Sequence, residues 1–255
     1  FFNKKFKISN TWKNKSEYKY LLNKDFEKLR YSKKKDVLYL IHMIFLDDKS
    51  GNNLHGVVNG ASLVKDRFGI PNSAYYFDGV DDNIVIPHDT LLDLGVYDEI
   101  VISMWINPSD SFNIGSDKSF VKKISPDTSW NYRFKVEGDT SSLDFDITPS
   151  DVSNVYSSIS LNSGQWYYLT LMRQGDSIFH FLDGEVIYSY MDSTEIGINT
   201  QGMIIGGSGE GSDWFKGIID DIVIAKGCGD HICTFDTKLK MKVFVAPFIR
   251  GLLRS

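Results

Sequence analysis

Hydrophobic and polar residues alternate along most of the chain from Val37 onward, and this pattern constrains the fold more than any other feature. In the segment EIVISMWINP, isoleucine and methionine residues fall on one side of an extended chain, and Val101, Ser103 and Trp105 fall on the other. Successive side chains of a β-strand point to opposite faces, so a period of two is typical of strands with one face in a core. The pattern predicts an all-β protein.

Turn signals separate the alternating segments at short intervals. Asp183 and Gly184, for example, stand between IFHFL and EVIYSY, and Asp-Gly is a frequent pair in two-residue hairpin turns. About a dozen strands joined in this way, with no helical periodicity between them, argue against a fold of alternating strands and helices. We therefore expect a two-sheet antiparallel jelly-roll sandwich.

The first 36 residues differ from the rest in charge and in periodicity. They hold 12 Lys and Arg against 4 Asp and Glu, a formal charge of +8, whereas the remainder holds 16 against 29, a formal charge of −13. A basic helical N-terminal arm is predicted by apolar residues that recur at helical spacing between lysines, namely Tyr18, Leu21, Leu22, Phe26 and Leu29. The apolar stripe of this helix is expected to lie on the sandwich or on another chain.

The sequence therefore predicts three parts: the arm at residues 1–36, the sandwich domain at 37–235, and a basic, apolar tail at 236–255. The tail, which contains KLKMKVFVAPFIRGLLRS, is expected to form an edge strand or an interaction peptide. Arm and tail both predict contacts with other subunits.

Composition argues against two classes of partner. No apolar run reaches the roughly 18 residues that a transmembrane helix needs. The acidic body lacks the basic surface on which phosphate binding depends, so we expect no nucleic-acid partner.

Cys228 and Cys233 are the two cysteines of the chain, and both lie in GCGDHICTF. Four residues between them suit a small disulfide loop in an oxidising compartment. Two buried free thiols, or a metal clip with His231, are the alternatives. A zinc site would need a fourth ligand and the usual paired spacing.

Four motifs in order resemble the laminin-G-like, concanavalin A-like jelly-roll domains. They are the stretch from Asp48 to Pro87 with its YYFDGVDD strand, the segment EIVISMWINP, the hairpin GQWYYLTLMRQGDSIFHFLDGEVI, and the closing strand FKGIIDDIVI. The resemblance spans residues 37–226 and implies the same jelly-roll fold, although a fold does not fix a function. The arm at 1–36 and the segment after the closing strand depart from the family pattern.

Three oxygen-bearing residues are candidates for a calcium site. Asp48 and Asn52 lie around a glycine in DDKSGNN, and Asp220 lies in IIDDIV. Strict alternation places Asp220 on the strand face of Ile222 and Ile224, where an unpaired carboxylate would be costly. A Ca²⁺ ion, which prefers oxygen ligands, or several hydrogen bonds would remove that cost. The resemblance implies that Asp48 and Asp220 share such an ion.

Three aspartates crowd the stretch YYFDGVDDNIVIP, which contains Asp78, Asp81 and Asp82. Asp78 and Gly79 are typical turn residues. A more distant resemblance, to the pentraxins, implies that Asp82 binds calcium, because pentraxins carry a calcium-binding Asp-Asn pair at this place. The alternative is a solvated turn.

The sequence contains no recognisable catalytic constellation. Glucanases of this fold carry two glutamates and an aspartate at alternating positions of one strand, and that pattern is missing. Asp144 and Asp146 share one face of LDFDI but have no third acid, and the histidines occur in no nucleophile motif. We therefore expect no enzyme activity.

Trp130 and Trp214 are the candidate ligand-binding residues, because both lie where a loop meets a strand. Trp105 and Trp166 lie within strands and are expected in the core. The sequence thus predicts a non-catalytic, calcium-stabilised extracellular binding or adhesion module that recognises glycan or protein ligands. The alternative is a structural subunit of a larger surface or virion assembly that uses the jelly roll as a protein–protein platform.

Overall fold

The computed structural model describes residues 39–43, 54–94, 100–110, 116–124, 130–138, 142–147, 157–207 and 213–226. Within these ranges the chain forms fifteen β-strands and one short 3₁₀ helix, η1 (Thr90–Leu92). The predicted arm and tail lie outside the described residues, so they and the domain limits stay predictions. None of the described helices has the length and apolar character needed to span a bilayer.

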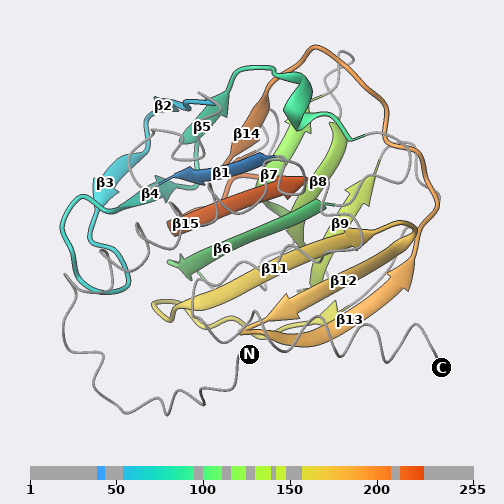
Figure 1. Ribbon diagram of the computed structural model, residues 1–255. Helices are drawn as coiled ribbons and strands as arrows, with labels where there is room; N and C mark the ends of the chain where they lie inside the picture. Colours follow the sequence, from blue (N-terminus) through green and yellow to red (C-terminus); the bar gives the residue numbers. More distant parts are fainter. Residues whose placement is uncertain are drawn as a thin grey trace, which may run out of the picture. The chain divides into compact units, whose positions relative to one another are not determined.

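The strands form two antiparallel sheets, and the all-β sandwich expected from the alternation is confirmed (Figure 1). Sheet A runs in the order β13 (Glu185–Met191), β12 (Ser177–Leu182), β11 (Tyr167–Gln174), β6 (Ile100–Pro108), β15 (Lys216–Lys226), β4 (Ala74–Asp78), β3 (Ser62–Val64). The remaining strand of this sheet, β1 (Tyr39–Met43), pairs with β15. Sheet B runs in the order β10 (Ser157–Ser158), β9 (Ser142–Ile147), β8 (Trp130–Glu137), β7 (Lys118–Ile124), β14 (Met203–Ile205), β5 (Asn83–Ile86), β2 (Val57–Asn59).

The core lies between the sheets and is built by the predicted alternation. On β6, Ile102 and Met104 are fully buried, and Tyr132 and Phe134 face them from β8. Burying one such side chain contributes about 1.5–3 kcal/mol to the free energy of folding. The repetition of this pattern over both sheets therefore holds the sandwich together.

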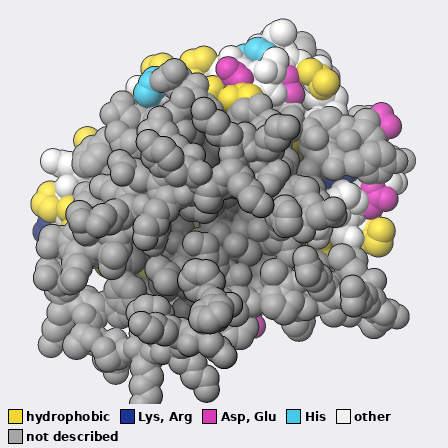
Figure 2. Space-filling view, viewed as in Figure 1, with side chains coloured by type: hydrophobic (Ala, Val, Ile, Leu, Met, Phe, Trp, Pro, Cys, Tyr) yellow, Lys and Arg dark blue, Asp and Glu magenta, His cyan; other side chains and the backbone are white. Residues whose placement is uncertain are grey.

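The outer face of sheet A is buried and largely apolar, with Ser103, Thr170 and Asp220 as buried polar side chains. Val101, Tyr168, Met172 and Phe181 alternate with core residues along their strands, yet each is at most 8% exposed. Figure 2 views the molecule from this side, and the described side chains that it shows lie mainly along the rim. On the outer face of sheet B, the side chains of Asp144 and Asp146 are partly exposed.

The hairpin between β12 and β13 has the predicted two-residue turn. Asp183 and Gly184 both adopt positive φ, 51° and 92°, which matches the right-handed twist of the flanking strands. The Asp183 carboxylate accepts a hydrogen bond of 2.8 Å from the backbone N–H of Tyr168 on β11. The turn is thereby tied to the neighbouring strand.

A β-bulge in β15 changes the predicted phase of the closing strand. The register with β6 shifts between Asp220 and Val223, and Asp221 has a φ of 47°. Ile222 and Ile224 consequently face the core, whereas Asp220 pairs with Trp105 on the outer face of sheet A. The expectation that Asp220 shares a face with Ile222 and Ile224 was therefore wrong.

A fully buried histidine lies between the sheets. His180 on β12 is 0% exposed, and its ring contacts those of Phe134 and Tyr190 at centroid distances of 6.4 and 5.7 Å. Burial lowers the pKa of His180 from its ordinary value of 6.5 to about 4. The neutral imidazole is thus part of the core.

His180 is expected to make the fold sensitive to acid. Because its folded pKa lies below 6.5, its contribution is complete above pH 6.5 and is lost as the pH falls toward 4. Between about pH 7 and pH 4.5 the loss amounts to about 2–3 kcal/mol. Urea unfolding of His180→Leu at the two pH values should show a pH dependence smaller by this amount. Equal pH dependence in His180→Leu and the wild type would refute the role.

Candidate functional site

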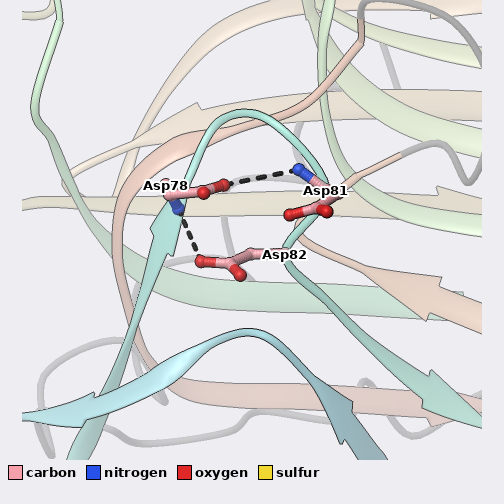
Figure 3. A group of neighbouring side chains, drawn as sticks. All are labelled: Asp78, Asp81 and Asp82. Atoms are coloured by element: carbon pink, nitrogen blue, oxygen red, sulfur yellow. Dashed lines mark hydrogen bonds between the residues drawn. The ribbon is translucent and has the colours of Figure 1, made fainter.

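The three aspartates between β4 and β5 form a hydrogen-bonded turn (Figure 3). The Asp78 carboxylate accepts the backbone N–H of Val80 at 2.8 Å, and the Asp82 carboxylate accepts that of Asp78 at 2.8 Å. Gly79 has a φ of 81°, a conformation that favours glycine. Turn chemistry therefore accounts for Asp78 and Asp82.

The same turn is the one group of three metal-ligating side chains found among the described residues. One carboxylate oxygen of each aspartate lies within 4.8 Å of the others. Burial raises the pKa of Asp82, and the carboxylates of Asp78 and Asp81 add to this effect. The assignment of Asp82 as a metal ligand stays a prediction, and its carboxylate already accepts a backbone hydrogen bond.

Asp220 has a cationic partner that the sequence analysis missed. Nη1 of Arg67 lies 2.5 Å from Oδ2 of Asp220, and Nη2 lies 2.5 Å from Oδ2 of Asp221. The Arg67 side chain is 6% exposed, and its guanidinium lies over the rings of Phe68 and Trp105 at 4.4 and 4.9 Å. Burial and the neighbouring Asp221 raise the pKa of Asp220, and Arg67 opposes that rise.

Several other predicted site residues lie outside the described residues. They are Asp48 and Asn52 of the calcium site, and Cys228 and Cys233 of the disulfide. The structure therefore brings Asp220 together with Arg67 and leaves the shared calcium ion and the disulfide as predictions. Trp130 belongs to β8, but its side chain is likewise outside the described set.

A dense group of charged side chains gathers on sheet B. We call it the sheet-B cluster, and it consists of Asp117, Arg133, Lys135, Glu137, Asp144, Asp146 and Asp213. Its centre is a cross-strand pairing: Arg133 lies opposite Asp146, and Lys135 lies opposite Asp144, between β8 and β9. Alternate residues of both strands face the core, so these four side chains point to the outer face.

The two cations of the sheet-B cluster hold its carboxylates in place. Arg133 donates to Asp213 at 2.5 Å, to Asp146 at 2.5 Å and to Asp117 at 3.1 Å. Lys135 donates to Asp117 at 2.7 Å and also bonds to Glu137. The cations are each 5% exposed, whereas the carboxylate side chains are 15–29% exposed.

The acid pair of β9 titrates asymmetrically. The carboxyl groups of Asp144 and Asp146 hydrogen-bond to each other. Burial and the Asp146 charge raise the pKa of Asp144. Burial acts in the same direction on Asp146, but the bond from Asp144 and the charges of Lys135 and Arg133 outweigh it and lower its pKa.

Trp214 adjoins the sheet-B cluster through its sequence neighbour Asp213, which bonds to Arg133. The indole is half-buried and packs on the backbone of Gly207, where a Cβ would lie 2.1 Å from Cε3. The roles of Trp130 and Trp214 in ligand binding stay predictions.

The charge pattern of β8 and β9 in the sequence could have indicated the sheet-B cluster, once the two strands are assumed to pair. Arg133 and Lys135 alternate with core residues on one strand, and Asp146 and Asp144 do so in reverse order on the next strand of the chain. Opposite charges at opposed positions of an antiparallel pair stabilise it. Arg67 has no comparable signal, because 153 residues separate it from Asp220.

Comparison with known families agrees with this architecture. Residues 78–228 match the family model Laminin_G_3, described as the concanavalin A-like lectin/glucanases superfamily. The chain belongs to this superfamily. The resemblance expected from the sequence motifs is thereby confirmed. No curated protein sequence matches the chain.

Solved structures of similar fold include a domain of an arabinanase and binding domains of toxins. Domain 4 of the extracellular arabinanase AbnA from Geobacillus stearothermophilus, in complex with arabinotriose, is 16% identical with a TM-score of 0.58, over 75% of this chain and 93% of that one. The binding domain of Paraclostridial Mosquitocidal Protein 1 is 16% identical with a TM-score of 0.55, over 74% and 48%. The ligand-binding domain of botulinum neurotoxin serotype D, in complex with N-acetylneuraminic acid, is 14% identical with a TM-score of 0.51, over 74% and 47%. The chain spans about half of each toxin domain, and at these identities the likeness shows the fold alone.

Removing Arg67 should destabilise the protein strongly. Arg67→Met leaves two buried carboxylates without their cation, which is expected to cost about 3–5 kcal/mol in the free energy of unfolding, measured with urea at neutral pH. The triple variant Arg67→Met, Asp220→Asn, Asp221→Asn should recover much of this loss, because no buried charge remains.

A matched control is the exposed ion pair of Lys216 and Asp110, whose side chains are 42% and 46% exposed. Asp110→Asn should change the free energy of unfolding by less than about 1 kcal/mol. If Arg67→Met were as mild as this control, the assigned pairing would be wrong.

Proposed function

We propose that the chain is a non-catalytic binding module that recognises a glycan through the outer face of sheet B. The observation that carries the proposal is the sheet-B cluster, in which two buried cations hold five partly exposed carboxylates. Membership in a superfamily of lectins and glucanases supports a binding role on this fold.

The choice of face follows from burial. On the outer face of sheet A, apolar side chains such as Val101 and Met172 and polar ones such as Ser103 and Thr170 are all buried. On sheet B the carboxylates of Asp117, Glu137 and Asp213 are 20–29% exposed, so their outer oxygens can meet a ligand. Among the described residues, this face presents the densest set of polar groups.

The chemistry of the cluster suits a polyhydroxyl ligand. Ionised carboxylates accept hydrogen bonds from hydroxyl groups, and each carboxylate oxygen can accept more than one. Arg133 and Lys135 fix the acceptors before the ligand arrives, so less side-chain entropy is lost on binding. Trp214, the half-buried sequence neighbour of Asp213, would supply an apolar ring surface for the ligand.

The geometry of the acid pair supports binding rather than hydrolysis. Glycosidases that use two carboxyl groups hold them about 5–9.5 Å apart, so that a sugar carbon or a water fits between them. Asp144 and Asp146 instead hydrogen-bond to each other and face Lys135.

The location of the module is part of the proposal. The structural neighbour AbnA is an extracellular enzyme, and its domain 4 was solved with a bound oligosaccharide. We place this chain likewise outside the cell or at a surface, where the Cys228–Cys233 disulfide would persist. The arm and the tail would then provide contacts to other subunits.

Weakening the cluster should weaken glycan binding. We expect a glycan array to identify neutral or charged oligosaccharide ligands of the wild type. Against the best of them, Asp213→Asn and Trp214→Ala should each raise Kd about tenfold in isothermal titration calorimetry, because each loses hydrogen bonds or ring contact. Asp110→Asn, outside the cluster, should leave Kd unchanged. A ligand whose Kd responds to neither cluster variant would place the binding face elsewhere.

Calcium is proposed to stabilise the folded state through Asp220. Asp220, Asp221 and Arg67 together carry a formal charge of −1, which is compatible with a bound cation. At a hundredfold excess over Kd, calcium would add about 2.7 kcal/mol, so a chelator should lower Tm. Asp220→Ala should abolish that response, whereas Asp78→Ala should keep it. If Asp78→Ala abolished the response and Asp220→Ala kept it, the ion would bind at the turn of Asp78, Asp81 and Asp82. If the chelator left the Tm of the wild type unchanged, calcium stabilisation would be refuted.

A further inference from the structure

The formal charges of the sheet-B cluster do not balance. Two cations, Arg133 and Lys135, are shared by five carboxylates, those of Asp117, Glu137, Asp144, Asp146 and Asp213. Five formal negative charges against two positive ones give −3. Lys118, which interacts with Asp117 and Asp213, and the buried Lys122, which lies opposite Arg133 on β7, reduce this to −1. The face therefore keeps a formal excess of one negative charge before the proton shared by Asp144 and Asp146 is counted.

The two signs of charge lie at different depths. Arg133 and Lys135 form the floor, each with a side chain 5% exposed, and the carboxylate side chains above them are 15–29% exposed. An approaching ligand thus meets carboxylate oxygens before it reaches a cation. An anionic group would be repelled at the point where a cationic group is attracted.

The buried lysine cannot serve all of its neighbours. An ammonium group has three N–H donors, and Lys135 faces four carboxylates, at 2.7 Å for Asp117, 3.2 Å for Asp146 and 3.9 Å for Asp144, with Glu137 as the fourth. The distance to Asp144 is too long for a hydrogen bond. Asp144 instead bonds to Asp146, and its raised pKa means that it retains a proton where a cation would otherwise lie.

A buried serine on β7 also faces the sheet-B cluster. Ser119 lies opposite Lys135, and its neighbour Phe120 faces the core, so the Ser119 hydroxyl lies on the face of the cluster. Its backbone N–H donates to the carbonyl of Asp213 at 3.0 Å. The hydroxyl is 0% exposed and has no hydrogen-bond partner within the described part of the chain. A buried polar group of this kind calls for a further partner.

We propose that the sheet-B cluster binds a cationic amine of its ligand, so that the glycan class it selects is an amino sugar rather than a sialic or uronic acid. This inference rests on the proposed function, since it assigns the ligand class of the same face. The amine would take the place of the proton between Asp144 and Asp146 and receive the remaining acceptors of Glu137 and Asp117.

Three tetrasaccharides test the proposal. Glucosamine and N-acetylglucosamine tetramers share one backbone and differ in amine charge, and a galacturonate tetramer is the anionic probe. Titrations are run at about pH 6, where the amines are charged, with a chelator present so that no bound metal contributes. We expect the glucosamine tetramer to bind at least ~10-fold more tightly than its acetylated counterpart, and the galacturonate tetramer to bind most weakly. Raising the salt concentration should reduce the preference, because exposed charges are screened.

Two variants assign the preference to residues. Glu137→Gln removes one carboxylate charge, and Asp144→Asn removes the carboxyl group that would hold the amine, each with little change in shape; circular dichroism verifies that they fold. Each should bring the preference for the glucosamine tetramer to within ~3-fold. Asp110→Asn, an exposed acid outside the cluster, should retain the full preference.

The outcomes separate the inference from the proposed function. Equal binding of the charged and acetylated tetramers, with both weakened by Asp213→Asn, would overturn the amine preference and leave the glycan-binding face in place. Failure of the glucosamine tetramer to bind would also overturn the preference, and the glycan array would then decide the proposed function separately.

Discussion

The closing strand β15 is the element on which the rest of the sandwich depends. It pairs with β6 along its length, and with β4 and β1 at its two ends, so it joins three other strands of sheet A. Its bulge places two adjacent aspartates, Asp220 and Asp221, in a buried position. Two adjacent buried carboxylates need a cationic partner. Arg67, in the loop between β3 and β4, is that partner. The strand pairing of β15 in sheet A and the ion pairs of Arg67 therefore depend on each other.

Strand content and core faces were predictable because alternation is a local property. The alternation of β6 was predicted, and its even-numbered residues are the ones that face the core; the Asp183-Gly184 turn has the positive φ angles that its residues favour. The bulge at Asp221 was not predictable, because an inserted residue shifts the phase without changing composition. Trp105 shows the consequence: it is buried as expected, but against Arg67 and Tyr168 on the outer face of sheet A.

The candidate site was harder to predict, because it is made by pairing rather than by a motif. The sequence shows Asp144 and Asp146 as two acids on one strand face. It does not show that Arg133 and Lys135 of β8 lie opposite them. Asp117 and Asp213 join from segments beside other strands of the sheet. Distances of this kind depend on tertiary structure, so no spacing rule in the sequence could have given them.

The Arg67 network and the sheet-B cluster are both built from cations and carboxylates. The solvent exposure of their carboxylates distinguishes their roles. Around Arg67, one guanidinium meets two carboxylates, and all three side chains are at most 10% exposed, so the network is closed and serves the fold. In the sheet-B cluster the cations are equally buried, but the carboxylates outnumber them and reach solvent. The buried cations orient the partly exposed carboxylates but do not use all of their hydrogen-bond acceptors. Oriented carboxylate oxygens with free acceptor capacity contribute little to folding stability, and a binding face requires them.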